Sequence, residues 1–68
     1  MDEIAKLRHL IEHWAEHNEE HANTYLQWAE KAEKSGNKEL CGILTEIADG
    51  TKKMNGLFEK AKKFANGN

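Results

Sequence analysis

With 68 residues and a formal net charge of −2, the chain has room for one small domain and lacks the basic surface that nucleic-acid binding requires. Its single cysteine excludes an internal disulfide, Met1-Asp2-Glu3 does not resemble the start of a signal peptide, and no run of about 20 apolar residues offers a membrane span. We therefore expect a cytoplasmic protein that contacts neither nucleic acid nor membrane. A core of this size is marginal without a staple or a partner.

The first predicted element is a helix over about residues 3–34. Its large apolar residues alternate in steps of three and four, a heptad pattern in which Ile4 takes position a and Leu7 takes position d. Positions a and d face the partner helix in such a pattern, so this stripe predicts the face that packs. Trp14 and Trp28 also fall at d, where we expect them to anchor the core.

The same count places polar residues in the middle of the stripe, with Asn18 at a and His21 at d. His17 falls beside the seam at g, whereas His13 at c and His9 at f lie progressively closer to solvent. A buried imidazole or amide without a partner costs roughly 1–3 kcal/mol. Two arrangements meet this need: a shared metal with Asn18 hydrogen-bonding near it, or a hydrogen bond from His21 to the second helix.

The turn at residues 35–37 separates the first helix from a second one over about residues 38–65. Gly36 suits a left-handed helix end, and Asn37 can cap the helix that follows, as Asp2 can cap the first. The second helix carries two apolar rows: Leu40, Leu44, Ile47, Thr51, Met54, Phe58, Ala61 and Ala65, and then Ile43, Gly50, Leu57 and Phe64. Two helices joined by a short turn predict an all-α fold, a single antiparallel hairpin domain over residues 1–68.

Folding the hairpin about Gly36 pairs residues whose numbers add to about 72, which sets Gly50 and Thr51 near His17 and His21. Small residues there either leave room for imidazole rings and an ion or let the helices pack closely. Because a lone hairpin cannot bury two apolar rows per helix, we expect a homodimer, a coiled-coil-like four-helix bundle. A site on the two-fold axis of this dimer would receive each histidine twice.

All the histidines of the chain form one ladder in the first helix, each four residues after the last: His9, His13, His17 and His21. Residues at this spacing are neighbours on one helix face, and such a histidine pair is a well-attested site for a divalent transition metal. Imidazoles near carboxylates, without a thiolate, suit Ni(II), Zn(II) or Cu(II). The polar residues expected around the bound ion are Asn18, Glu16, Glu20 and His9. The alternative is a structural dimerisation module whose histidines are ordinary polar residues.

Spacing argues against the familiar enzyme sites. A zinc protease needs His-Glu-x-x-His and a ferritin-like di-iron site needs Glu-x-x-His, and neither pattern occurs. No serine or cysteine lies near a histidine to act as a nucleophile, and no glycine-rich loop could cradle phosphate. An exposed imidazole such as His9 could still carry a phosphoryl group, but the other histidines would then have no role. We expect a binding protein and no enzyme.

The segment from His13 to His21 fits the pattern His-(Trp/Phe)-x2-His-x3-His through Trp14 and His17, and it resembles the N-terminal region of the CooJ family of nickel chaperones. The resemblance implies a helical homodimer that binds Ni(II) between its chains, with His13, His17 and His21 as the ligands. It also implies a client nickel enzyme, carbon monoxide dehydrogenase, to which the metal is delivered.

Overall fold

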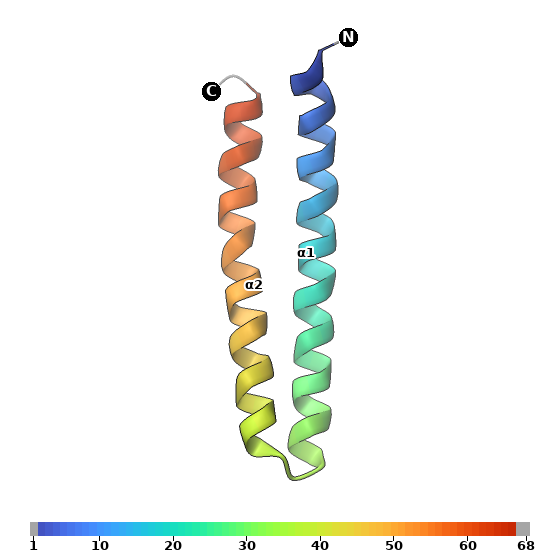
Figure 1. Cartoon of the computed structure of the whole chain (residues 1–68), viewed down its shortest axis with the longest axis vertical. Coiled ribbons are helices and arrows are strands. Elements are labelled where there is room, and N and C mark those ends of the chain that lie inside the picture. The colour runs from blue at the N-terminus through green and yellow to red at the C-terminus, as the bar shows by residue number, and fades with distance from the viewer. Residues whose placement is uncertain (1, 67–68) are drawn as a thin grey trace.

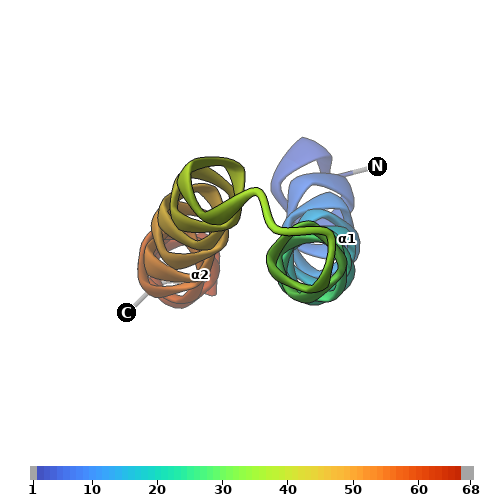
Figure 2. The same ribbon diagram turned by 90° about the horizontal axis from the view of Figure 1, so that it is seen from below.

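Two helices and the turn between them make up the computed structural model, which describes residues 2–66. Helix α1 spans Glu3–Lys34 and helix α2 spans Lys38–Ala65, and they run antiparallel, side by side (Figure 1, Figure 2). The body is 53 Å long, with the turn at one end and the chain ends at the other. The expected helical hairpin is confirmed; residues 1, 67 and 68 of the expected domain lie outside the described residues.

Short polar side chains close the start of each helix. The Oδ1 atom of Asp2 accepts a hydrogen bond from the backbone N–H of Ile4 at 3.0 Å, and that of Asn37 accepts one from Leu40 at 3.1 Å. Gly36 has a φ of +88°, a left-handed conformation that a residue without Cβ adopts at no steric cost. These local choices fix where each helix begins and where the chain reverses.

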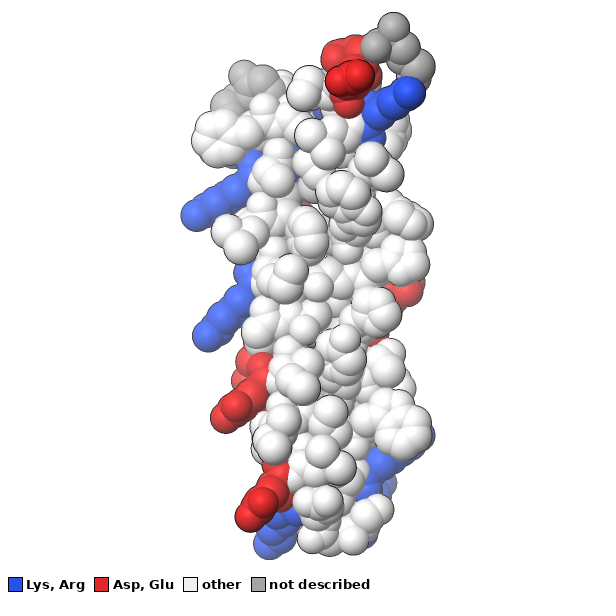
Figure 3. All heavy atoms as spheres, in the orientation of Figure 1, with Lys and Arg blue, Asp and Glu red and all other residues white. Residues whose placement is uncertain are grey.

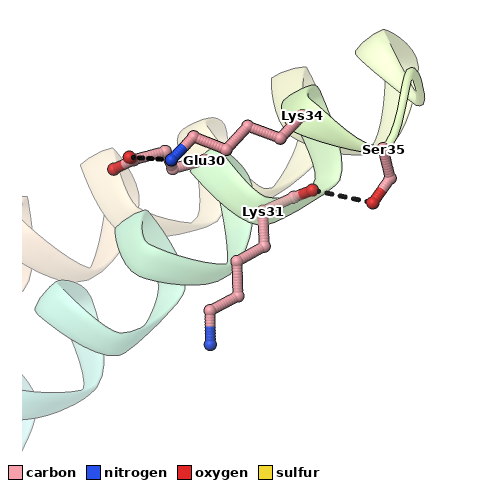
Figure 4. A network of polar contacts seen from close by, with 4 residues as sticks. All are labelled: Glu30, Lys31, Lys34 and Ser35. Atoms are coloured by element: carbon pink, nitrogen blue, oxygen red, sulfur yellow. Dashed lines mark hydrogen bonds and ion pairs between the residues drawn. The ribbon is translucent and has the colours of Figure 1, made fainter.

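The end of α1 next to the turn is held by contacts within the helix (Figure 4). Lys34 Nζ lies 3.1 Å from Glu30 Oε1, and the Ser35 hydroxyl donates to the Lys31 carbonyl at 3.0 Å. Lys31 Nζ also lies 4.3 Å from the centroid of the Trp28 ring. Cations at this position complement the negative end of the helix dipole.

The contact between the helices is built from small residues. Among residues 2–66, the buried side chains are Ile11, Ala22, Ala29, Ala32 and Ala48. In α1 the half-buried Ala15 begins a row of alanines that recurs every seven residues, beside the row of Ile11 and Asn18. Because alanines let two backbones approach closely, α1 packs on α2 through heptad positions a and e, where positions a and d were expected.

The expectation that Trp14 and Trp28 anchor the core is therefore wrong for the hairpin. Their side chains are 45% and 55% exposed, and Leu7, another d residue, is 37% exposed. Position d lies about a quarter of a turn away from the alanine seam, so its large side chains point past α2. His21 shares position d and is exposed as well.

Asn18 is the polar residue that the seam does contain. Its half-buried amide donates to the Thr51 carbonyl at 2.6 Å and to Asn55 Oδ1 at 2.8 Å. On the same flank, Lys62 Nζ lies 3.9 Å from Glu12 Oε1. The side-chain pairs Asn18–Asn55 and Glu12–Lys62 have residue numbers that add to 73 and 74, close to the expected register.

Replacing Asn18 with alanine should lower the free energy of unfolding by about 1–3 kcal/mol, because Asn55 and the Thr51 carbonyl lose their donor in the seam. Urea denaturation followed by circular dichroism, at one fixed chain concentration, measures the change. Asn23→Ala on the exposed side of α1 is the matched control and should change stability by less than about 0.5 kcal/mol. Equal losses in the two variants would show that the seam amide contributes nothing.

A second apolar face is left on the outside of the hairpin. Its large side chains are 37–74% exposed: Ile4, Leu7, Leu10, Trp14 and Trp28 of α1, and Leu40, Ile43, Ile47, Met54, Leu57 and Phe64 of α2. Figure 3 shows a surface without charge along the whole hairpin, with charged side chains at its edges. We call this surface the uncharged face. Over the residues that the structure describes, neither helix is long and apolar enough to cross a bilayer.

Candidate metal centre

The histidines lie along one exposed strip of α1, as their spacing predicts. The ring centroids of His13 and His17 are 4.3 Å apart, and those of His17 and His21 are 6.4 Å apart. His9 is exposed one turn nearer the start of the helix. His13 and His17 are thus the closest pair, and His21 follows one turn later.

The later histidines of the strip lie on the uncharged face. His21 occupies the same heptad row as Trp14 and Trp28, and His17 occupies the neighbouring row. The ring of His21 stacks on that of Tyr25, with centroids 6.2 Å apart and planes 19° apart. Since Tyr25 is half-buried against the seam, this contact links the last histidine to the packed part of the hairpin.

Sequence reasoning missed this role of Tyr25. Tyr25 stands four residues after His21, which is the same interval that separates the histidines. The signal was therefore present in the sequence, as a fifth aromatic ring that continues the four-residue interval of the ladder.

A single chain supplies only part of a metal site. Among residues 2–66, no three His, Cys, Asp or Glu side chains come together in an arrangement that could hold an ion. His13 and His17 present two neighbouring imidazoles, whereas tetrahedral zinc and the larger nickel sites take four ligands or more. Their exposed rings are free to turn toward one ion. The arrangement can therefore bind a metal with a pair of imidazoles and needs further ligands from outside this pair.

The polar residues expected around the ion are oriented in several directions. The amide of Asn18 is engaged with α2, as described above. Glu16 lines a groove of about 370 Å³ between the helices, together with Glu12 and Glu19. Glu20 and His9 are exposed on α1. Three of the glutamates near the histidines, Glu12, Glu16 and Glu19, thus line a groove shared with α2.

Gly50 is not needed for close packing of α1 on α2. It is exposed, and a Cβ atom at this position would meet nothing within 4 Å. Its neighbour Thr51 lies in the seam, where its carbonyl accepts the hydrogen bond from Asn18. Gly50 instead interrupts the outer row between Ile43 and Leu57, and so leaves a gap in the uncharged face.

The fold and the site together define a two-helix hairpin that carries an exposed histidine strip beside an apolar face. The chain matches the family described as "Domain of unknown function (DUF8180)" over residues 7–65, and it belongs to this family. It is also similar to an uncharacterized protein of Archaeoglobus fulgidus, 36% identical over 58 residues, which cover 85% of this chain and 92% of that protein. No solved structure gives a significant match.

Proposed function

We propose that this protein binds a transition-metal ion, with Ni(II) as the first candidate, through the histidines of α1 where two copies of the chain meet. The observation that carries the proposal is the His13–His17 pair, whose exposed rings lie 4.3 Å apart on one helix face. His21 completes the ligand set of each chain. Zn(II) and Cu(II) share the preference for imidazole and are the competing ions.

A homodimer supplies the ligands that one chain lacks. The chain exposes 5344 Å², whereas a compact monomer of 7.8 kDa would expose about 4,400 Å². The excess of roughly 900 Å² is similar to the roughly 800 Å² that each partner buries in a typical stable interface. Two hairpins packed through the uncharged face would form a four-helix bundle and bring the histidines of both chains to one interface.

The further step, from metal binding to metal delivery, rests on the resemblance of the His13 to His21 segment to the CooJ family alone. By that resemblance the protein is a nickel metallochaperone and binds without catalysing a reaction. Its client would be a nickel enzyme such as carbon monoxide dehydrogenase.

Nickel binding should weaken steeply in acid. Imidazole binds a metal only after losing its proton, which model imidazole does near pH 6.5, so each ligand contributes about a tenfold loss of affinity per pH unit below this value. Calorimetric titration with Ni(II), Zn(II) and Cu(II) at pH 7.5 and pH 5.5 measures the effect. One ion per two chains at the higher pH and at least a hundredfold weaker binding at the lower pH are expected for two or more imidazoles.

An affinity that stays constant between these pH values would point to carboxylate ligands, such as those of the groove lined by Glu12, Glu16 and Glu19. Competition with Mg²⁺ then separates the two cases, since a hard cation displaces a metal from carboxylates and leaves an imidazole site occupied.

The second candidate function is a structural dimerisation module without a metal. The uncharged face favours this candidate. Phe64 is 74% exposed in the single hairpin, and an apolar side chain so exposed needs a covering partner whether or not the histidines bind a metal. In this case the metal-free dimer forms with full affinity, and Ni(II) changes neither its mass nor its melting temperature.

A further inference from the structure

Two rows of mostly charged side chains border the uncharged face, one on each helix. Position c of α1 holds Lys6, His13, Glu20, Gln27 and Lys34, and the equivalent row of α2 holds Glu39, Glu46, Lys53 and Lys60. All of these residues are exposed. Each row lies on the far side of its helix from the seam, so the two rows form opposite edges of the face. Along the α2 edge in Figure 3, positive side chains lie toward the chain ends and negative ones toward the turn, with a further positive side chain at the turn itself.

The two edges carry complementary charges at equal heights. The register shown by Asn18–Asn55, in which residue numbers add to 73, sets Glu20 level with Lys53. It also sets Lys34 level with Glu39. Within one chain these groups are kept apart by the width of the hairpin. A second copy, rotated by half a turn about the long axis, would place the α1 edge of one chain against the α2 edge of the other at the same height.

We infer that the uncharged face is covered by a second copy of this chain in this orientation, with both turns at the same end of the bundle. Each Glu20 faces the partner's Lys53, and each Lys34 faces the partner's Glu39 while Glu30 stays beside it. The inference rests on the proposed homodimer and specifies its arrangement. Opposite charges at the rim of an interface determine orientation more than they add affinity.

The reversed orientation, with the turns at opposite ends, is the other arrangement that a two-fold axis allows for two stacked hairpins. It sets each helix antiparallel to its own copy. When the faces overlap over their full length, Glu20 meets the partner's Glu20 and Lys53 meets the partner's Lys53. These like charges oppose association.

The same-end orientation also has a consequence for the histidines. It brings the two ladders to equal height on diagonally opposed helices. Both copies of His21 then face the middle of the interface, whereas the two copies of His13 lie at its opposite edges, each level with the partner's Lys60. The helix that each His21 faces carries the partner's Gly50 within one turn of that height. The gap that Gly50 leaves in the uncharged face is thus opposite the imidazole and provides room for it.

Reversing the charges at the edges tests the orientation in the metal-free protein. Glu20→Lys and Lys53→Glu should each raise the dimer dissociation constant roughly tenfold, because each change turns two attractive rim contacts into repulsive ones. The double variant restores opposite charges and should return to within about twofold of the original protein. Sedimentation equilibrium at low ionic strength measures the constants, since salt screens exposed charges. Lys52→Glu, one residue away on another side of α2, is the control and should change little.

A distance measurement gives an independent answer. A nitroxide attached at Ser35→Cys, in a chain that also carries Cys41→Ser, reports the separation of the two turns. Interhelical spacings of 8–10 Å put the labels within about 25 Å of each other in the same-end dimer. The reversed dimer separates them by nearly the 53 Å length of the hairpin.

The short distance together with rescue in the double variant supports the inference. A long distance, or a double variant no better than its parents, overturns the same-end arrangement and leaves the homodimer and its metal site standing. A chain that sediments as a monomer at micromolar concentration overturns the inference together with the proposed homodimer. In that case a partner other than a second copy covers the face.

Discussion

A Leu57→Glu variant is expected to sediment as a monomer at concentrations where the original protein is a dimer. Leu57 is 64% exposed in the single hairpin and lies in the outer row of α2 on the uncharged face. Burial of a leucine contributes about 1.5–3 kcal/mol, and the change removes this contribution twice per dimer and adds two carboxylates to an apolar interface. The dissociation constant should therefore rise by about three orders of magnitude or more.

Sedimentation velocity over a range of chain concentrations measures the change, and it reports mass whether or not the separated chain stays folded. Leu57→Met is the matched control, since it keeps the apolar volume and should preserve the dimer. If the original protein is a monomer, a charge at the exposed position 57 would leave the sedimenting mass unchanged and would raise solubility. That result would remove the basis for a metal site shared between chains.

The second large effect concerns the ladder. A His17→Ala/His21→Ala double variant should lose tight Ni(II) binding, because it removes the two imidazoles that lie nearest the centre of the uncharged face. His13→Ala should weaken binding, since it leaves His17 without its neighbour at 4.3 Å. His9→Ala is the control, and its affinity should match that of the original protein.

Metal should also raise the melting temperature of the original protein, because an ion that binds only the folded dimer stabilises it by mass action. At a free ion concentration a hundred times the Kd, this stabilisation is about 2.7 kcal/mol. The double variant should show no such shift. If the histidines are polar interface residues without a metal, the pattern reverses: Ni(II) leaves every melting temperature unchanged, and His21→Leu makes the dimer more stable.

Local chemistry made much of the fold predictable. The two helix starts and the chain reversal each need a backbone cap or a positive φ that few residue types provide. Asp2, Asn37 and Gly36 provide them, so the helix ends and the reversal follow from these residues. The polar position of Asn18 in the seam also follows from the heptad count, because an amide there can bond across to α2. The register then depends only on the length of the turn.

The rotation of the helices was not predictable in the same way. A heptad count identifies apolar rows by their large members, and Trp14 and Trp28 outweigh the alanines of the row that begins at Ala15. Which row of α1 packs on α2 depends on how closely the two backbones can approach. Small side chains allow the closest approach, so the alanine row packs within the chain. The spacing of the histidines likewise predicted neighbouring rings on α1. Whether more than two imidazole rings converge on an ion depends on how a second chain packs. The spacing of residues within one chain does not predict that packing.

The small size of the buried core has a consequence for how the protein exists in a cell. A hairpin whose fully packed side chains are Ile11 and alanines such as Ala22 and Ala48 gains little free energy from folding alone. In the proposed bundle most of the apolar burial comes from association, so folding and assembly become one equilibrium whose position depends on chain concentration. Helix content should then rise with concentration and with bound metal. If the proposed metal site exists, metal-free chains at low abundance would be the ones open to proteolysis, and the lifetime of the protein would depend on its bound metal.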